Sequence, residues 1–150
     1  MANFQFRLAT LLRLREAWRD ERRAHLADAQ RAEQLILERI AAIDDDMSTA
    51  RRQYVDAARA RTVNVDLLTD LARYEMILKA QRQSADQQRQ AVVAEVQKRR
   101  SALVAADRDV RVLEKLRESQ QQRYDEAEAL QELKRLDEMA VVRYDREEAT

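Results

Sequence analysis

The sequence contains no glycine, no proline and no cysteine among its 150 residues. Glycine and proline are the residues that most often end or interrupt helices, and typical proteins contain about 7% and 5% of them. Their absence therefore predicts long, uninterrupted helices. The absence of cysteine excludes disulfides, thiol chemistry and sulfur-ligated metals, and the absence of glycine excludes a glycine-rich phosphate-binding loop.

Aromatic residues are also scarce, at 5% of the chain, whereas charged residues make up 37%. This leaves too little large apolar material for a multilayer core, although it is enough for a narrow apolar seam. The 28 basic and 28 acidic residues cancel. The only basic cluster is Lys98, Arg99 and Arg100, which we interpret as a solvated helical face, so the sequence does not predict nucleic-acid binding.

The N-terminal segment has neither the apolar core of a signal peptide nor the run of about 20 apolar residues that a membrane-spanning helix needs. Arg7, Arg13 and Arg15 interrupt its apolar residues. We therefore expect a cytoplasmic chain.

Apolar residues in the first part of the chain recur at spacings built from steps of four and three, which is typical of the buried seam of a coiled coil. The residues on this spacing are Phe4, Leu8, Leu11, Trp18, Ala29, Ala32, Ile36, Ile43, Met47, Ala50, Tyr54 and Ala57. Arg15, Arg22, His25 and Arg39 also fall on the predicted seam as polar interruptions. We expect Trp18 and His25 to have packing roles there.

The pattern lapses at residues 62–66, where β-branched and helix-capping residues predict a turn with Asn64 or Asp66 as the cap. The seam then resumes, with a predicted shift of one residue between Val92 and Val96. The sequence thus predicts an all-α fold: one antiparallel two-helix coiled-coil hairpin over residues 1–150, with helices at about 4–61 and 67–146. The second helix is the longer, so its end from about Ala127 has no partner helix and is free to contact another protein.

The sequence predicts no catalytic site, because a two-helix hairpin provides no enclosed pocket in which reactive groups could converge. His25 is the only histidine, so neither a metal-binding pair nor a nucleophile with a histidine base can be assembled in the usual way. The carboxylates of residues 44–46 diverge by about 100° per residue around a helix and are interpreted as a solvated face. We expect no enzyme activity, cofactor or metal.

Two stretches near the ends of the chain resemble one known family. Residues 4–15 read Phe-Gln-Phe-Arg-Leu-Ala-Thr-Leu-Leu-Arg-Leu-Arg, and residues 113–118 read Leu-Glu-Lys-Leu-Arg-Glu. Tyr124, the stretch 136–140 and the pair Arg143 and Tyr144 follow at matching spacing. In these features the chain resembles the FliJ family, soluble components of the bacterial flagellar export apparatus, over essentially its whole length.

The resemblance implies a hairpin similar to the central stalk of rotary ATPases, seated in the ring of the export ATPase FliI. It implies that the end with both termini enters the ring and promotes ATPase assembly or turnover, through Leu8, Leu11, Leu12, Leu113 and Leu116.

The resemblance further implies that the end near the turn contacts FlhA, the membrane export gate, and so couples the ATPase to secretion. The residues that match the family's gate-contacting positions are Met47, Tyr54, Tyr74 and Leu78. Tyr54 and Tyr74 also fall on the predicted seam, and packing is the favoured role for them. The cellular location that the resemblance implies is the cytoplasm, with peripheral association at the inner face of the membrane.

Three functions remain open, in this order: the flagellar export stalk, a generic coiled-coil scaffold or export chaperone, and an RNA-binding helical arm. An arm would need a basic face, which the sequence lacks. The stalk of an injectisome has the same architecture as the flagellar one. Export chaperones are possible further partners, whereas nucleic acid and small-molecule substrates are not expected.

Overall fold

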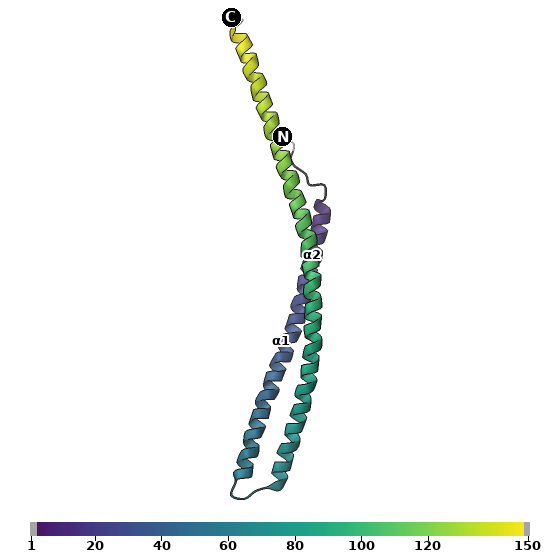
Figure 1. Ribbon diagram of the computed structural model, residues 1–150, viewed down its shortest axis with the longest axis vertical. Coiled ribbons are helices and arrows are strands. Elements are labelled where there is room, and N and C mark those ends of the chain that lie inside the picture. The colour runs from purple at the N-terminus through teal and green to yellow at the C-terminus, as the bar shows by residue number, and fades with distance from the viewer. Residues whose placement is uncertain (1–2, 149–150) are drawn as a thin grey trace. The chain divides into compact units, whose positions relative to one another are not determined.

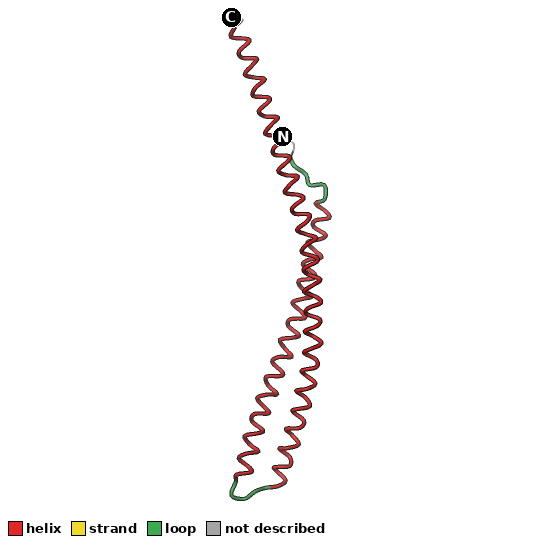
Figure 2. Tube along the Cα trace, in the orientation of Figure 1, coloured by secondary structure: helices red, strands yellow, loops and turns green. Residues whose placement is uncertain are grey.

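The computed structural model describes the backbone of residues 3–148 and the side chains of residues 3–144. It contains two helices, α1 (Ala9–Arg59) of 51 residues and α2 (Val65–Glu148) of 84 residues, and no strand in this range. The turn at residues 60–64 joins them (Figure 1), and segment 3–8 precedes α1 without helical structure (Figure 2). The all-α fold and the greater length of the second helix confirm the prediction.

The turn ends at Asn64, which caps α2. The backbone N–H of Leu67 donates a hydrogen bond to Asn64 Oδ1 over 3.2 Å, and that of Leu68 donates to the Asn64 carbonyl over 3.2 Å. Asp66 lies in the first turn, where its negative charge interacts favourably with the helix dipole. Of the two residues that the sequence offers as the cap, Asn64 is therefore the one that accepts the bond.

The contacts divide the chain into two compact units, residues 1–20 with 105–150, called the termini unit, and residues 21–104, called the turn unit. In the turn unit, α1 and α2 are antiparallel, because hydrogen bonds join residues 51 to 75, 44 to 82 and 25 to 99. In the termini unit, Arg15 contacts Asp109 and Phe4 contacts Tyr124, so the two segments also run in opposite directions there.

The core of the turn unit is a line of small and medium apolar side chains between the helices. Ile43 and Ala50 of α1 pack with Leu78 and Ala85 of α2, and Met47 covers the cluster together with Ile40. Alanines at two of the four buried positions of this cluster let the helix backbones approach closely. This core is narrow, as the composition predicts.

The core of the termini unit consists of Leu12, Val110 and Leu113, with Phe6 packed against them. The segment before α1 is held by a hydrogen bond of 3.1 Å from the Ala9 N–H to the Phe6 carbonyl. Phe4 places its ring 5.8 Å from the ring of Tyr124. The aromatic opening thus lies outside the first helix, although the sequence predicted helix from residue 4, and it packs back onto α2.

The buried line on α1 differs by one residue from the predicted seam at several positions. Leu26 and Ile40 are half-buried in the turn unit, whereas the predicted His25 and Arg39 are exposed. In the termini unit Trp18 is 47% exposed, and its ring instead lies 5.0 Å from the Arg15 guanidinium. The expected packing roles of His25 and Trp18 are therefore wrong. The adjacent Leu26 buries more apolar surface than His25 would, and the Arg15 cation stacks on the exposed indole of Trp18.

On α2 the predicted one-residue shift of the seam does not occur in the described residues. One alternating spacing runs through the turn unit at the buried or half-buried residues Leu71, Glu75, Leu78, Ala85, Val92, Val96, Arg99 and Leu103. The half-buried residues outside this spacing each lie next to one that is on it: Asp86, Val93, Glu95 and Ala102. Glu75 occupies the seam position predicted for Tyr74, because its carboxylate is bonded to Arg51 across the seam. The polar residues that interrupt the apolar spacing thus form bonds between the helices.

Candidate partner-binding surfaces

The turn unit carries exposed apolar and aromatic side chains near the turn. Tyr54 of α1 is 41% exposed and Tyr74 of α2 is 45% exposed. The expectation that these two tyrosines pack in the seam is therefore wrong, and both are accessible to a partner. Leu78 is only 3% exposed and Met47 packs on the core. The four residues matched to gate contacts thus divide into two that face solvent and two that support the hairpin.

Two further exposed apolar residues lie near the turn and could not be identified from the apolar spacing alone. Met76 is 70% exposed and Ile77 is 54% exposed. The signal was present in the run Met76-Ile77-Leu78, because a narrow seam can bury only one of three consecutive side chains. Leu78 is the buried one, so the other two face away from the core.

A bridge of charges fixes α1 against α2 beside the tyrosines. The Glu75 carboxylate accepts hydrogen bonds from Lys79 over 3.0 Å and from Arg51 over 3.1 Å. These two cations, Lys79 first and then Arg51, hold the pKa of Glu75 below its ordinary value. A second bond between the helices joins Arg82 Nε to Asp44 Oδ1 over 2.6 Å, and it raises the pKa of Arg82. Asp44 thus has a structural role in the acidic run.

The five leucines that the family resemblance assigns to contacts with the FliI ring also divide into buried and exposed residues in the termini unit. Leu12 and Leu113 belong to its buried core. Leu8, Leu11 and Leu116 are each somewhat more than a third exposed. The structure therefore brings the core pair together in the interior and leaves the other three leucines accessible.

The C-terminal part of α2 is exposed throughout its described side chains. No residue from 125 to 144 is buried or half-buried. In Figure 1 this part of α2 continues past the N-terminal segment. The ring contact between Phe4 and Tyr124 lies just before it on α2. Its exposed apolar residues are Leu130, Leu133, Leu136, Met139, Val141, Val142 and Tyr144. Leu136, Met139 and Val142 lie beside the charged residues Arg135, Glu138 and Arg143 on this exposed helix.

The described residues form neither a metal site nor a membrane-spanning helix. No group of three or more potential ligands is arranged to hold a metal ion in that part of the chain. No helix there has a stretch apolar enough to cross a membrane. The accessible features in the described residues are thus apolar surfaces on helices and a cationic hollow between them in the turn unit.

Comparison with known proteins identifies the family of this chain. Neither a curated protein nor a solved structure matches the chain. The family model described as "Flagellar FliJ protein" matches residues 4–149, which is nearly the whole chain. The match includes both the aromatic opening that packs on α2 and the exposed C-terminal part of α2. The chain belongs to the FliJ family, whose members are non-catalytic components of the flagellar type III protein export apparatus.

Proposed function

We propose that this protein is a non-enzymatic coiled-coil stalk that binds both the export ATPase FliI and the export gate protein FlhA. In this role its termini unit binds the FliI ring and promotes ring assembly and ATP hydrolysis. Its turn unit binds the cytoplasmic part of FlhA at the inner face of the membrane, which couples the ATPase to secretion. ATP chemistry stays in the ring subunits.

The observation that carries the proposal is that each unit keeps its own group of apolar side chains in solvent. In the termini unit these are Leu8, Leu11 and Leu116, followed by the apolar residues of 125–144. In the turn unit they are Tyr54, Tyr74, Met76 and Ile77. Exposed apolar groups of this kind are typical of protein-binding surfaces. Two such groups on separate units support two different protein partners.

The test of the proposal measures ATP hydrolysis by FliI with and without the full chain. We expect the wild type to raise the rate and to hydrolyse nothing by itself. The variant with Leu11→Ala and Leu116→Ala should lose most of the stimulation, because buried apolar contacts with the ring are removed while the core residues Leu12 and Leu113 stay in place.

The matched control is Leu35→Ala, which makes the same truncation at a leucine that is also exposed but lies in the turn unit. It should stimulate FliI as the wild type does. Absence of stimulation by the wild type would contradict the stalk function and favour a scaffold or chaperone. Equal losses in the control would show that the effect is not specific to the termini unit.

A further inference from the structure

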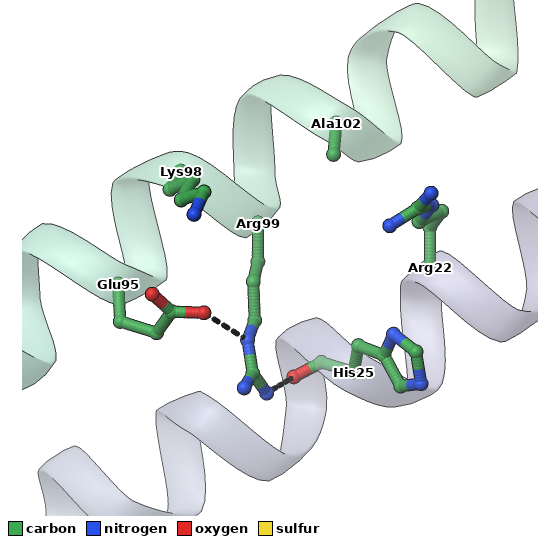
Figure 3. Close-up of a pocket in the computed structure, with 6 residues that line it drawn as sticks. All are labelled: Arg22, His25, Glu95, Lys98, Arg99 and Ala102. Carbon is green, nitrogen blue, oxygen red and sulfur yellow. Dashed lines mark hydrogen bonds and ion pairs between the residues drawn. The ribbon is translucent and has the colours of Figure 1, made fainter.

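A concave site on the turn unit lies between the two helices at the place where polar residues interrupt the seam. This hollow has a volume of about 300 Å³ and is lined by Arg22 and His25 of α1 and by Glu95, Lys98, Arg99 and Ala102 of α2. Figure 3 shows these side chains converging from both helices on the space between them. The triplet that the sequence analysis interpreted as solvated thus supplies two of the residues that line the hollow.

Arg99 is held rigidly at the edge of the hollow. Its Nε donates a hydrogen bond to Glu95 Oε1 over 2.8 Å, and its terminal nitrogen donates to the backbone carbonyl of His25 over 2.6 Å (Figure 3). The bond to Arg99, together with the nearby charges of Arg99 and Lys98, holds the pKa of Glu95 below its ordinary value. Glu95 is therefore ionised at neutral pH, and its charge is directed at Arg99.

Arg22 is the cation that this arrangement leaves without compensation. It extends from α1 toward α2 (Figure 3), and no hydrogen bond or ion pair joins its guanidinium to a described residue. The nearby Glu21 carboxylate lies 4.0 Å from His25 Nε2 instead. Arg22, Lys98 and Arg99 thus share a single carboxylate in a chain whose overall formal charge is zero.

The excess of positive charge is compact. It comes from about one turn of each helix. Glu95 lines the hollow itself but is bonded to Arg99, and Glu21 lies outside the hollow beside His25. An extended acidic peptide would also meet Glu21, whereas a small multivalent anion would stay within the hollow. A guanidinium group can donate two parallel hydrogen bonds to two oxygens of one phosphate. A guanidinium that is already held in place, as that of Arg99 is, loses little conformational entropy when it binds.

We propose that this hollow is a binding site for a compact phosphate-class oxyanion, such as inorganic phosphate or diphosphate, held by Arg22, Lys98 and Arg99. The anion supplies the negative charge that the hollow lacks and bridges α1 to α2. The site is separate from the apolar surfaces of the proposed function and does not depend on FliI or FlhA.

The test measures the melting temperature of the full chain by circular dichroism while inorganic diphosphate is added, with sodium chloride adjusted to keep the ionic strength constant. We expect the melting temperature to rise with diphosphate concentration, by about 3 °C at roughly ten times the dissociation constant, and to keep rising logarithmically above it. Arg22→Gln should weaken diphosphate binding by on the order of tenfold, because one charge-assisted contact is lost. Without the anion this variant should melt no lower than the wild type, since it removes an uncompensated charge.

The matched control is Arg100→Gln, which removes a neighbouring charge that does not line the hollow. It should respond to diphosphate as the wild type does. A parallel titration with ADP tests whether the diphosphate group of a nucleotide also binds. A shift of the melting temperature with inorganic diphosphate supports the proposal whether or not ADP produces the same shift. The proposal would be overturned if diphosphate gave no shift at constant ionic strength, whether or not ADP gave one. An equal response from the Arg22→Gln variant would also overturn it.

Discussion

Single residues of this protein have either a structural or a surface role, and burial decides which. Leu78 and Tyr74 are one helical turn apart on α2, yet Leu78 is in the core and Tyr74 is exposed. Sequence spacing alone could not separate them, because both are compatible with a coiled-coil seam. The difference arises from Glu75, whose bond to Arg51 occupies the flank of the seam and leaves Tyr74 outside.

Truncating these two residues should therefore have opposite effects. Leu78→Ala should lower the free energy of unfolding by about 3 kcal/mol, because it leaves a cavity in a narrow core. Tyr74→Ala should change stability little but should weaken binding to the cytoplasmic part of FlhA. Denaturant unfolding and isothermal titration calorimetry measure the two effects. Tyr144→Ala truncates another exposed tyrosine, in the termini unit, and should bind FlhA normally. Unfolding of the Tyr74→Ala variant would contradict its surface role.

Acid should weaken the bonds between the helices through Glu75. Because its pKa is lower in the folded chain than in the unfolded chain, the unfolded chain binds more protons as the pH falls. The stabilisation is present above the ordinary glutamate pKa of about 4.3 and is lost as the pH falls through the lowered value. Glu75→Gln should therefore flatten the dependence of melting temperature on pH in the acid range. An unchanged profile would mean that Arg51 and Lys79 do not stabilise the fold.

At the scale of elements, the beginning of α2 depends on one side chain. Asn64 accepts the Leu67 N–H, which would otherwise have no partner within the helix. The sequence predicted the turn and offered Asn64 as one of two caps. The exact ends of the helices could not be predicted, since they depend on which competing hydrogen bonds form.

Replacing the cap should destabilise the turn unit measurably. Asn64→Ala should lower the free energy of unfolding by about 1 kcal/mol, whereas Asn64→Asp should retain most of the stability because a carboxylate also accepts the bond. Urea unfolding followed by circular dichroism measures both variants. Equal stability of the alanine variant and the wild type would show that the 3.2 Å bond contributes nothing.

At the scale of the whole molecule, composition and period predicted the all-α fold and the unequal lengths of the two helices. The lack of glycine and proline left no other class of structure, so this prediction needed no detail of packing. The predicted seam on α1 was accurate at Ile43 and Ala50 but one residue early at His25 and Arg39. Apolar spacing does not specify which of two adjacent residues faces the partner helix. That choice depends on the volumes and charges across the seam.

Removing the end of the chain should separate folding from function. A variant that ends at residue 128 lacks only side chains that are exposed among those described, so its melting temperature should fall little. It should nevertheless stimulate FliI less, because the exposed leucines of α2 are gone. Melting curves and ATPase assays on the same preparation measure the two results. Full stimulation by the shortened chain would place the ring contact entirely before residue 128.

The order of the exposed apolar residues on α2 restricts the geometry of whatever contacts them. Leu130, Leu133, Leu136, Met139 and Val142 recur every three residues. Since each residue turns the helix by about 100°, every step of three moves the stripe back by about 60° around the axis. Five such positions wind around most of the circumference. A flat surface can touch only part of this spiral, whereas an annular partner that encloses the helix can contact all of it.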